Sequence, residues 1–274
     1  MDPKRHVIIT GSASGLGRAL AVEMGHRGWH IALADVDDAG NQETLELVRS
    51  AGGSGQTEHL DVTSVDAWKA LHDKLHATWP ALDILVNNAG VGCAGNVGEL
   101  PLEDWRWIID INLYGAIYGC HTMTPWMKQN TRGAHIVNIA SMAAIVSVPG
   151  MAPYNVTKAG VLSLSETLSG ELRPHKIAVT GVCPSFFQTN ILENGRFHKP
   201  DQRQVANTIM SHAHVSADAI AKKIMRAIDR KRLYVFAPAV AGLFWRLKRV
   251  MPRSILRFVA HNYRSRLAAA EADL

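Results

Sequence analysis

The sequence has few cysteines, and their spacing forms no framework. Its 274 residues contain three cysteines, Cys93, Cys120 and Cys183, which lie far apart and form no CxxC pattern. This argues against a disulfide scaffold and against a cysteine-based metal site. The 13 histidines also lack metal-ligand spacing, so we expect no bound metal. Few, unpaired cysteines are typical of a reducing compartment, and the expected location is cytoplasmic.

Long apolar runs are missing as well. The apolar run VIIT at residues 7–10 is too short for the core of a signal peptide, and no later stretch has membrane-spanning length. Acidic residues are scarce toward the C-terminus, where residues 222–266 carry 13 Lys and Arg against one acid, Asp229. No nucleic-acid-binding motif accompanies this charge, so we expect no nucleic-acid partner.

Strand-like and helix-like patterns alternate along the chain. Helical spacing falls at residues 16–28, 41–53, 64–79, 102–128, 152–173 and 216–231, and short apolar runs fall at 6–10, 30–36, 56–62, 82–90, 135–141, 176–184 and 232–238. This alternation predicts an α/β fold with a parallel sheet and helices on both faces. We expect a single catalytic domain at residues 1–238, with residues 239–274 as a helical extension of it.

A glycine-rich loop follows the first predicted strand and opens a helix. Gly11, Gly15 and Gly17 lie in TGSASGLG, residues 10–17. Glycines there allow a tight turn and let a pyrophosphate approach the helix N-terminus. The second strand ends at Asp35, where a carboxylate can accept hydrogen bonds from an adenosine ribose and repel a 2′-phosphate. This favours NAD over NADP, although Arg18 is a nearby cation that would weaken the preference.

A tyrosine and a lysine lie four residues apart in APYNVTKAG, residues 152–160. They can be two surface residues of an ordinary helix, and the spacing alone does not distinguish this reading from a functional one. In the functional reading Tyr154 and Lys158 share one helix face, and the ammonium favours the phenolate. A free tyrosine has a pKa of about 10, so this effect would bring it toward use as a base.

Together these motifs resemble the short-chain dehydrogenase/reductase family. TGSASGLG (10–17), LDV (60–62), NNAG (87–90), Asn112, Ser141, YNVTK (154–158) and CPSFFQT (183–189) occur in the family's order, and the resemblance covers residues 6 to 238. It implies a Rossmann-type doubly wound sheet of seven parallel strands, a nicotinamide cofactor and a homodimer or homotetramer. It also implies an oxidoreductase.

The resemblance assigns roles to individual residues. Tyr154 would be the general acid/base, Lys158 would bind the nicotinamide ribose and lower the tyrosine pKa, Ser141 would hydrogen-bond the reacting oxygen, and Asn112 would hold a relay water. Asn112 can also be a buried amide satisfied by backbone. The expected cofactor-binding residues, besides Tyr154 and Lys158, are Gly11, Ser12, Ser14, Gly15, Leu16, Gly17, Asp35, Val36, Asp61, Val62, Asn88, Ala89, Gly90, Pro184, Ser185, Phe187 and Thr189. Ser185 replaces the family's usual glycine, and we expect a small local adjustment.

The predicted substrate side is apolar. Its expected lining is Met142, Ile145, Val146, Val148, Met151, Phe186, Phe187, Ile191, Leu192 and Phe197, of which about half are expected to belong to the core. This favours a hydrophobic secondary alcohol or ketone, such as a steroid, retinoid or long-chain compound. The alternatives are an NADPH-dependent carbonyl or 3-ketoacyl reductase and, in another class, a non-catalytic dinucleotide sensor.

The C-terminal extension mixes apolar and basic residues, including Leu243, Phe244, Trp245 and Phe258. It can lie on anionic lipid, or it can pack on a pocket or a partner subunit with its charges in water. Of these, packing is the favoured interpretation, because runs of charge are usually solvated faces.

Overall fold

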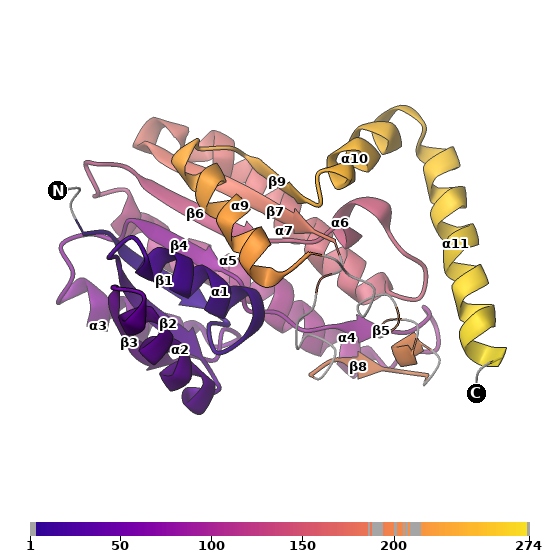
Figure 1. The fold of residues 1–274 in the computed structure, drawn as a ribbon, viewed down its shortest axis with the longest axis horizontal. Helices are drawn as coiled ribbons and strands as arrows, with labels where there is room; N and C mark the ends of the chain where they lie inside the picture. The colour runs from indigo at the N-terminus through magenta and orange to yellow at the C-terminus, as the bar shows by residue number, and fades with distance from the viewer. Residues whose placement is uncertain are drawn as a thin grey trace.

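The computed structural model describes residues 4–185, 187, 194–199, 202–204, 206, 208 and 215–272, without the side chains of residues 266 and 269–272. Seven parallel strands form one sheet in the order β3-β2-β1-β4-β6-β7-β9 (Figure 1). The strands are β1 (His6–Thr10), β2 (His30–Asp35), β3 (Ser54–His59), β4 (Ile84–Asn87), β6 (Ala134–Ile139), β7 (Ile177–Pro184) and β9 (Tyr234–Ala237). The chain builds outward from β1 in one direction and from β4 in the other, which is the doubly wound topology expected.

The predicted bounds of the third and fourth strands fit least well, and each differs by two residues at the start and three at the end. For the third strand the expected run was 56–62, whereas β3 ends at His59. It pairs with β2 as far as Asp35, and Leu60 then donates its amide to the Asp35 carbonyl. The Asp61 side chain accepts from the amide of Thr63, which turns the chain away from the sheet. The LDV motif therefore lies at the strand's carboxyl end, not within it.

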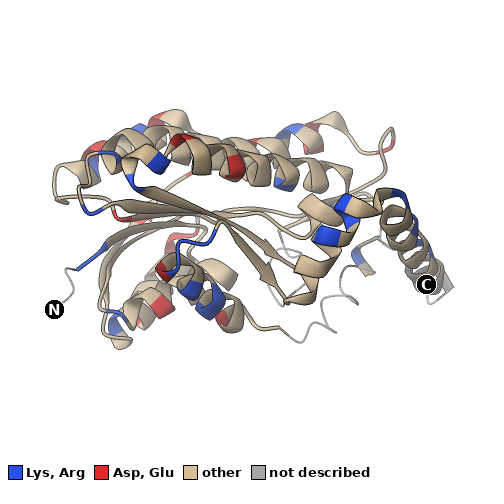
Figure 2. Cartoon of the chain, turned by 90° about the horizontal axis from the view of Figure 1, so that it is seen from above, with Lys and Arg blue, Asp and Glu red and all other residues tan. Residues whose placement is uncertain are grey.

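Helices cover both faces of the sheet (Figure 2). One layer consists of α1 (Gly15–Gly25), α2 (Asp38–Ser50) and α9 (Ala217–Asp229), and the other of α3 (Val65–His76), α5 (Gly115–Met127) and α7 (Ala152–Glu171). Alternate residues of β1 supply the two cores, because Val7 and Ile9 pack with the first layer and Ile8 with the second. Both faces are buried, which explains why the strand sequences are almost continuously apolar.

The long helix expected at 102–128 is not continuous. It consists of α4 (Leu102–Ile109), a π-helical turn at Asp110–Tyr114 and α5. Asn112 lies in that wider turn and directs its amide at the backbone of Val91. A π-helical turn inside an α-helix commonly marks a functional position, and here it places a buried amide beside the carboxyl end of β4.

The remaining elements lie outside the sheet and its two helix layers, and all but the 3-10 turn, which precedes β7 at the amino edge, lie at the carboxyl edge or beyond it. They are the paired strands β5 (Cys93–Ala94) and β8 (Arg196–Phe197), the short helix α6 (Ala143–Val146), the 3-10 turn Arg173–His175, and the C-terminal helices α10 (Val240–Val250) and α11 (Pro252–Ala272). The expected helical extension is therefore present. Among the described residues, no helix is both long and apolar enough to span a membrane.

Candidate active site

A cavity of about 1390 Å³ lies at the carboxyl ends of the central strands and extends from the glycine-rich loop to α11. This is the edge where open α/β sheets bind ligands. Most of the residues predicted from the sequence line it. These are Gly11, Ser14, Gly15, Leu16, Asp35, Val36, Asp61, Val62, Asn88, Ala89, Gly90, Ser141, Tyr154, Lys158, Pro184, Ser185 and Phe187.

Three of the predicted site residues that the structure describes are not part of this lining. Ser12 is fully buried, and its hydroxyl lies 2.7 Å from Asn41 Oδ1, so its side chain supports the loop and does not face a ligand. Gly17 packs against the loop, and Asn112 lies behind the cavity wall. Thr189 lies outside the described residues, as do Phe186, Ile191 and Leu192 of the predicted substrate side.

The glycine-rich loop has the shape that a pyrophosphate requires. Gly11 and Gly15 adopt positive φ angles of 64° and 54°, which let the chain turn sharply from β1 into α1. A Cβ at Gly17 would lie 2.1 Å from the Gly11 carbonyl oxygen, so only glycine allows the first turn of α1 to pack this closely. The N-terminus of α1 thus opens on the cavity, where its free amides favour a phosphate.

Asp35 is held at the end of β2 by backbone amides. Its carboxylate accepts from Ala13 N at 2.9 Å and from Asp37 N at 3.1 Å, and the residue lines the cavity. The nearby Arg18 donates through Nε to Thr44 at 3.0 Å and pairs with Glu43 at 2.9 Å. The arginine is therefore held along α2 by its own partners, and the Asp35 carboxylate lines the cavity together with Asp37 and Asp61.

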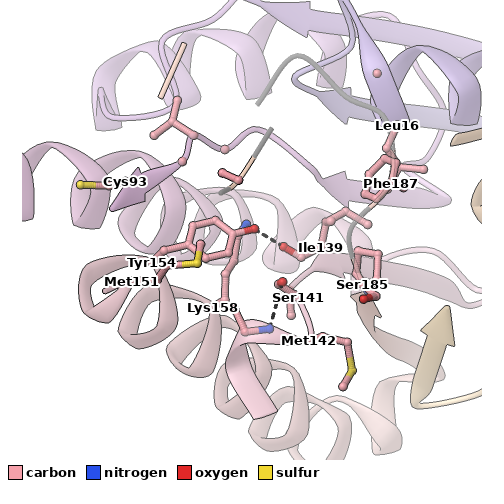
Figure 3. A pocket seen from close by; sticks show the side chains of 18 of the residues that line it. Leu16, Cys93, Ile139, Ser141, Met142, Met151, Tyr154, Lys158, Ser185 and Phe187 are labelled. Carbon is pink, nitrogen blue, oxygen red and sulfur yellow. Dashed lines mark hydrogen bonds between the residues drawn. The ribbon is translucent and has the colours of Figure 1, made fainter. Parts of the chain in front are cut away.

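Tyr154, Lys158 and Ser141 come together at the other end of the cavity (Figure 3). Pro153 lies in the first turn of α7, where its missing N–H is not needed, and this starts the helix just before the tyrosine. Lys158 Nζ donates to the Ile139 carbonyl at 3.0 Å and lies 5.8 Å from the centre of the Tyr154 ring. The two side chains therefore share one face of α7, as the four-residue spacing predicted.

Burial controls the ionisation of both groups. Burial raises the pKa of Tyr154, and a hydrogen bond with Ser141 opposes that rise. Burial lowers the pKa of Lys158 from 10.5 to about 8. The expected lowering of the tyrosine pKa by the lysine is not found within the chain itself, because burial is the largest effect on this pKa and the opposing hydrogen bond comes from Ser141.

Asn112 behaves as an amide satisfied by backbone, which is one of its two predicted readings. Its Nδ2 donates to the Val91 carbonyl at 2.9 Å, and its Oδ1 accepts from the Val91 amide at 2.8 Å. The side chain is only 2% exposed. These bonds fix the segment that follows β4 and lines the cavity, while the role of Asn112 in holding a water stays a prediction.

The substrate side of the cavity is apolar. Met142, Val146, Val148, Met151 and Phe197 line it as predicted, whereas Ile145 is buried in the core beneath α10. The C-terminal helices add Phe244, Phe258, Val259, Asn262 and Tyr263, which the sequence analysis did not assign to the pocket. Their only signal in the sequence was an apolar, helical pattern, which equally fits packing elsewhere.

Comparison with known proteins agrees with this geometry. The profile of the family described as short chain dehydrogenase matches residues 5–199. A short chain dehydrogenase/reductase from Burkholderia phymatum, solved in complex with NAD, superposes with a TM-score of 0.84 at 30% identity, over 90% of this chain and 93% of that one. A short-chain dehydrogenase from Sphingobium yanoikuyae, solved with NADPH, gives 0.78 at 25% identity, over 92% and 95%.

Two curated relatives are similar in sequence. "Probable oxidoreductase EphD" of Mycobacterium tuberculosis is 30% identical over 91% of this chain, but the match spans only 43% of that longer protein. "3beta-hydroxysteroid dehydrogenase 1" of Eggerthella lenta is 31% identical over 77% of this chain and 81% of the relative. With the fold, the cavity and the family match in agreement, the chain belongs to the short chain dehydrogenase family.

Proposed function

We propose that this chain is an NAD-dependent oxidoreductase that interconverts a hydrophobic secondary alcohol and its ketone. One observation carries the proposal: Tyr154, Ser141 and Lys158 meet in a cavity whose other end is a glycine-rich loop and an aspartate. A dinucleotide would lie between these ends, held by Gly11, Gly15 and the N-terminus of α1 at its pyrophosphate and by Asp35 at its adenosine ribose. When bound, it supplies the acceptor for the hydride that leaves the carbinol carbon.

The chain's own residues handle the proton. In the oxidative direction Tyr154 takes the proton of the substrate hydroxyl as the C–H bond breaks, and in the reductive direction it returns that proton. Ser141 hydrogen-bonds the same oxygen and holds it near the phenol. Lys158, whose Nζ donates to the Ile139 carbonyl, would bind the nicotinamide ribose when the dinucleotide is present.

The apolar wall supports a steroid-like, retinoid-like or long-chain substrate. Among the described residues that line the cavity, Lys158 is the only lysine or arginine, so no other cation is available to bind a substrate carboxylate. The name of the Eggerthella lenta relative supports a steroid-sized alcohol for that protein. A panel of hydrophobic secondary alcohols, followed by NADH absorbance, identifies the substrate.

Replacing Tyr154 by phenylalanine tests the chemistry. The substitution removes one hydroxyl and keeps the ring, so we expect turnover to fall about a hundredfold to ten-thousandfold. NAD affinity, measured by fluorescence titration, should stay within about twofold, since no phosphate or ribose contact is lost. If Tyr154→Phe keeps comparable turnover, the role assigned to Tyr154 is refuted. If the natural chain binds NAD tightly but turns over no alcohol, a dinucleotide sensor is favoured.

The choice of NAD is argued from Asp35. We expect Asp35→Ala to lower kcat/KM with NAD by about tenfold to a hundredfold, because hydrogen bonds from the ribose to a charged acceptor are lost. Activity with NADP should stay equal or rise. Asp35→Asn is the matched control, since it keeps an acceptor for the loop amides without the charge. A natural chain that already prefers NADPH would favour the alternative, a carbonyl or ketoacyl reductase.

We also propose that the chain forms a homodimer or homotetramer and works in the cytoplasm. Exposed apolar side chains on the α4–α7 side, Leu102, Tyr114 and Val156, support assembly. The three cysteines are free and buried, which is consistent with a reducing compartment. Sedimentation velocity measures the assembly, and a monomer at micromolar concentration would contradict it.

A further inference from the structure

The two C-terminal helices meet at a corner that projects from the body of the molecule (Figure 1). Four apolar side chains lie exposed at this turn, and we call them the corner patch: Leu247, Val250, Met251 and Leu256. Val250 is 81% exposed and Met251 is 51% exposed. Val250 and Met251 thus leave more than half of their surface open, and exposed apolar side chains that cluster at a projecting turn mark a contact surface.

Helix α10 is apolar on two sides, and only one of them is covered. Its inner side packs on β9, where Trp245 contacts the rings of Tyr234 and Phe236. This agrees with the packing interpretation of the extension. Its outer side carries Leu243, Leu247 and Val250, which are spaced four and three residues apart and are all exposed. That spacing places them in one stripe, which leads directly into the corner patch.

The charge around this surface has one sign. Residues 240–268 contain seven Lys and Arg and no Asp or Glu, and the ribbon beside the C-terminus in Figure 2 is blue and tan. Arg253, Arg257 and Arg264 are exposed and are four and seven residues apart, so they share one face of α11. Arg249 lies over the Trp245 ring, and Lys248 differs from the others in that it donates to the Ile145 carbonyl.

We propose that the corner of α10 and α11 docks on an anionic lipid surface. The corner patch would enter the headgroup region, and the arginines would contact lipid phosphates. The positive charge around the corner patch distinguishes between a lipid surface, a second copy of the chain and a nucleic acid. A second copy docking through the same patch would bring the arginines of both copies together, and a nucleic acid would leave the apolar tip without a partner. Only an anionic interface satisfies both the apolar and the basic groups.

The same helices connect this surface to the cavity. Phe244, Phe258 and Val259 line the cavity from α10 and α11, and Tyr263 packs against Gly150 in the segment just before α7. Docking at the corner therefore holds the apolar side of the cavity close to lipid. An apolar ligand dissolved in the bilayer would then have a short route to the site. The docking itself does not depend on the proposed reaction.

Flotation of the full chain with vesicles tests the proposal. We expect binding to vesicles of equimolar phosphatidylcholine and phosphatidylglycerol, weak binding to phosphatidylcholine alone, and loss of binding in high salt. Arg253→Gln and Arg257→Gln should each lower the partition coefficient about fivefold. Val250→Asp should also lower it, and because this side chain is almost fully exposed, the variant should unfold at the same urea concentration as the natural chain.

The control is a variant at the opposite end of the molecule that removes more positive charge than either arginine substitution does. Lys128→Gln with Arg173→Gln removes two exposed cations near the amino edge of the sheet, and we expect it to bind vesicles like the natural chain. Equal binding to neutral and anionic vesicles, or an equal loss in the control, would overturn the proposal. So would a Val250→Asp chain that binds vesicles normally but loses a dimer seen by sedimentation velocity, since that result assigns the patch to a second copy.

Discussion

Two ionisable side chains meet at the inner end of the cavity, and burial acts on them in opposite directions. It raises the pKa of the Tyr154 phenol and lowers that of the Lys158 amine to about 8. In each case the neutral form is favoured, because a charge is poorly solvated there. Among the described residues, the bond from Lys158 to the Ile139 carbonyl and the bond between Tyr154 and Ser141 offset part of this penalty. The residues that fit catalysis are therefore placed at a cost in stability.

Lys158→Met should make this cost measurable. The folded chain lowers the lysine pKa from 10.5 to about 8, so below pH 8 the charged amine destabilises the fold by about 3 kcal/mol. Between pH 8 and 10.5 Lys158 carries a proton more often in the unfolded chain than in the folded chain. The natural chain therefore gains stability as the pH rises through this range. We expect the variant to lack this gain and to be inactive, and urea unfolding at about pH 7 and about pH 10 measures the difference.

Lys128→Met is the control, because Lys128 is an exposed lysine at the end of α5. It should show the same pH dependence as the natural chain. If Lys158→Met also keeps that dependence, the amine is solvated and its pKa is not lowered. If the variant keeps normal turnover, the lysine has no part in the reaction.

At the scale of elements, the π-helical turn between α4 and α5 shows what one polar residue does to a helix. Asn112 forms two hydrogen bonds with the backbone of Val91, and the helix widens by a residue at that point. The wider turn lets the side chain reach across to the loop after β4, which lines the cavity beside the predicted nicotinamide site. A local defect in one element thereby positions a segment of another.

Asn112→Ala should loosen that segment. It leaves the amide and carbonyl of Val91 without their partner, and we expect the free energy of unfolding to fall by about 2 kcal/mol. Turnover should fall more than the affinity for NAD, since the displaced segment lies nearest the reacting end. Denaturant unfolding and a kcat-against-KM comparison measure the two effects. Asn112→Asp is the control, because its carboxylate can accept from Val91 N but cannot donate to the Val91 carbonyl. We expect it to keep at least half of the loss in unfolding free energy. A fully stable Asn112→Ala would show that the pairing with Val91 does not support the fold.

The bounds of most elements could be predicted from the sequence, because apolar runs and caps are local signals. The helical pattern expected at 64–79 begins with Ser64, and its hydroxyl caps α3 by accepting from Ala67 N at 3.2 Å. The interruption at Asn112 could not be predicted, because its cause is a contact with Val91 that lies 21 residues away. The same applies to Ser12, whose orientation toward Asn41 depends on how α2 packs against the loop.

At the scale of the whole molecule, the alternation of strands and helices predicts the doubly wound sheet, and the sheet then brings the loop glycines, Asp35 and Tyr154 to one edge. The place of the C-terminal helices does not follow from the sequence in the same way. Their apolar residues suit a core, a cavity wall or a lipid surface equally well, and only the folded body decides which of them remain exposed. Phe244 and Phe258 reach the cavity because α10 turns back over α6.

Three partly or fully buried histidines with lowered pKa values lie toward the edge of the sheet opposite the cavity. Burial lowers the pKa of His6 at the start of β1 and of His30 at the start of β2, and it lowers that of His135 in β6 to about 4. His135 Nε2 lies 2.8 Å from Thr180 Oγ1, whose own proton goes to the Arg232 carbonyl, so the neutral imidazole donates to the threonine. Protonation at Nδ1 adds a charge in a buried place between β6 and β7.

We therefore expect the whole molecule to lose stability in mild acid, in large part through His135. Its pKa is 6.5 unfolded and about 4 folded, so the unfolded chain binds the extra proton first, and stability present above pH 6.5 is lost as the pH falls toward 4. The loss from this one group is about 3 kcal/mol. His135→Gln keeps a donor for Thr180 without a titrating ring. In urea unfolding, the slope of its unfolding free energy against pH should therefore be smaller by the equivalent of about one bound proton. His121→Gln, at an exposed histidine of α5, is the control and should keep the full slope. An unchanged slope in His135→Gln would show that other groups drive the acid transition.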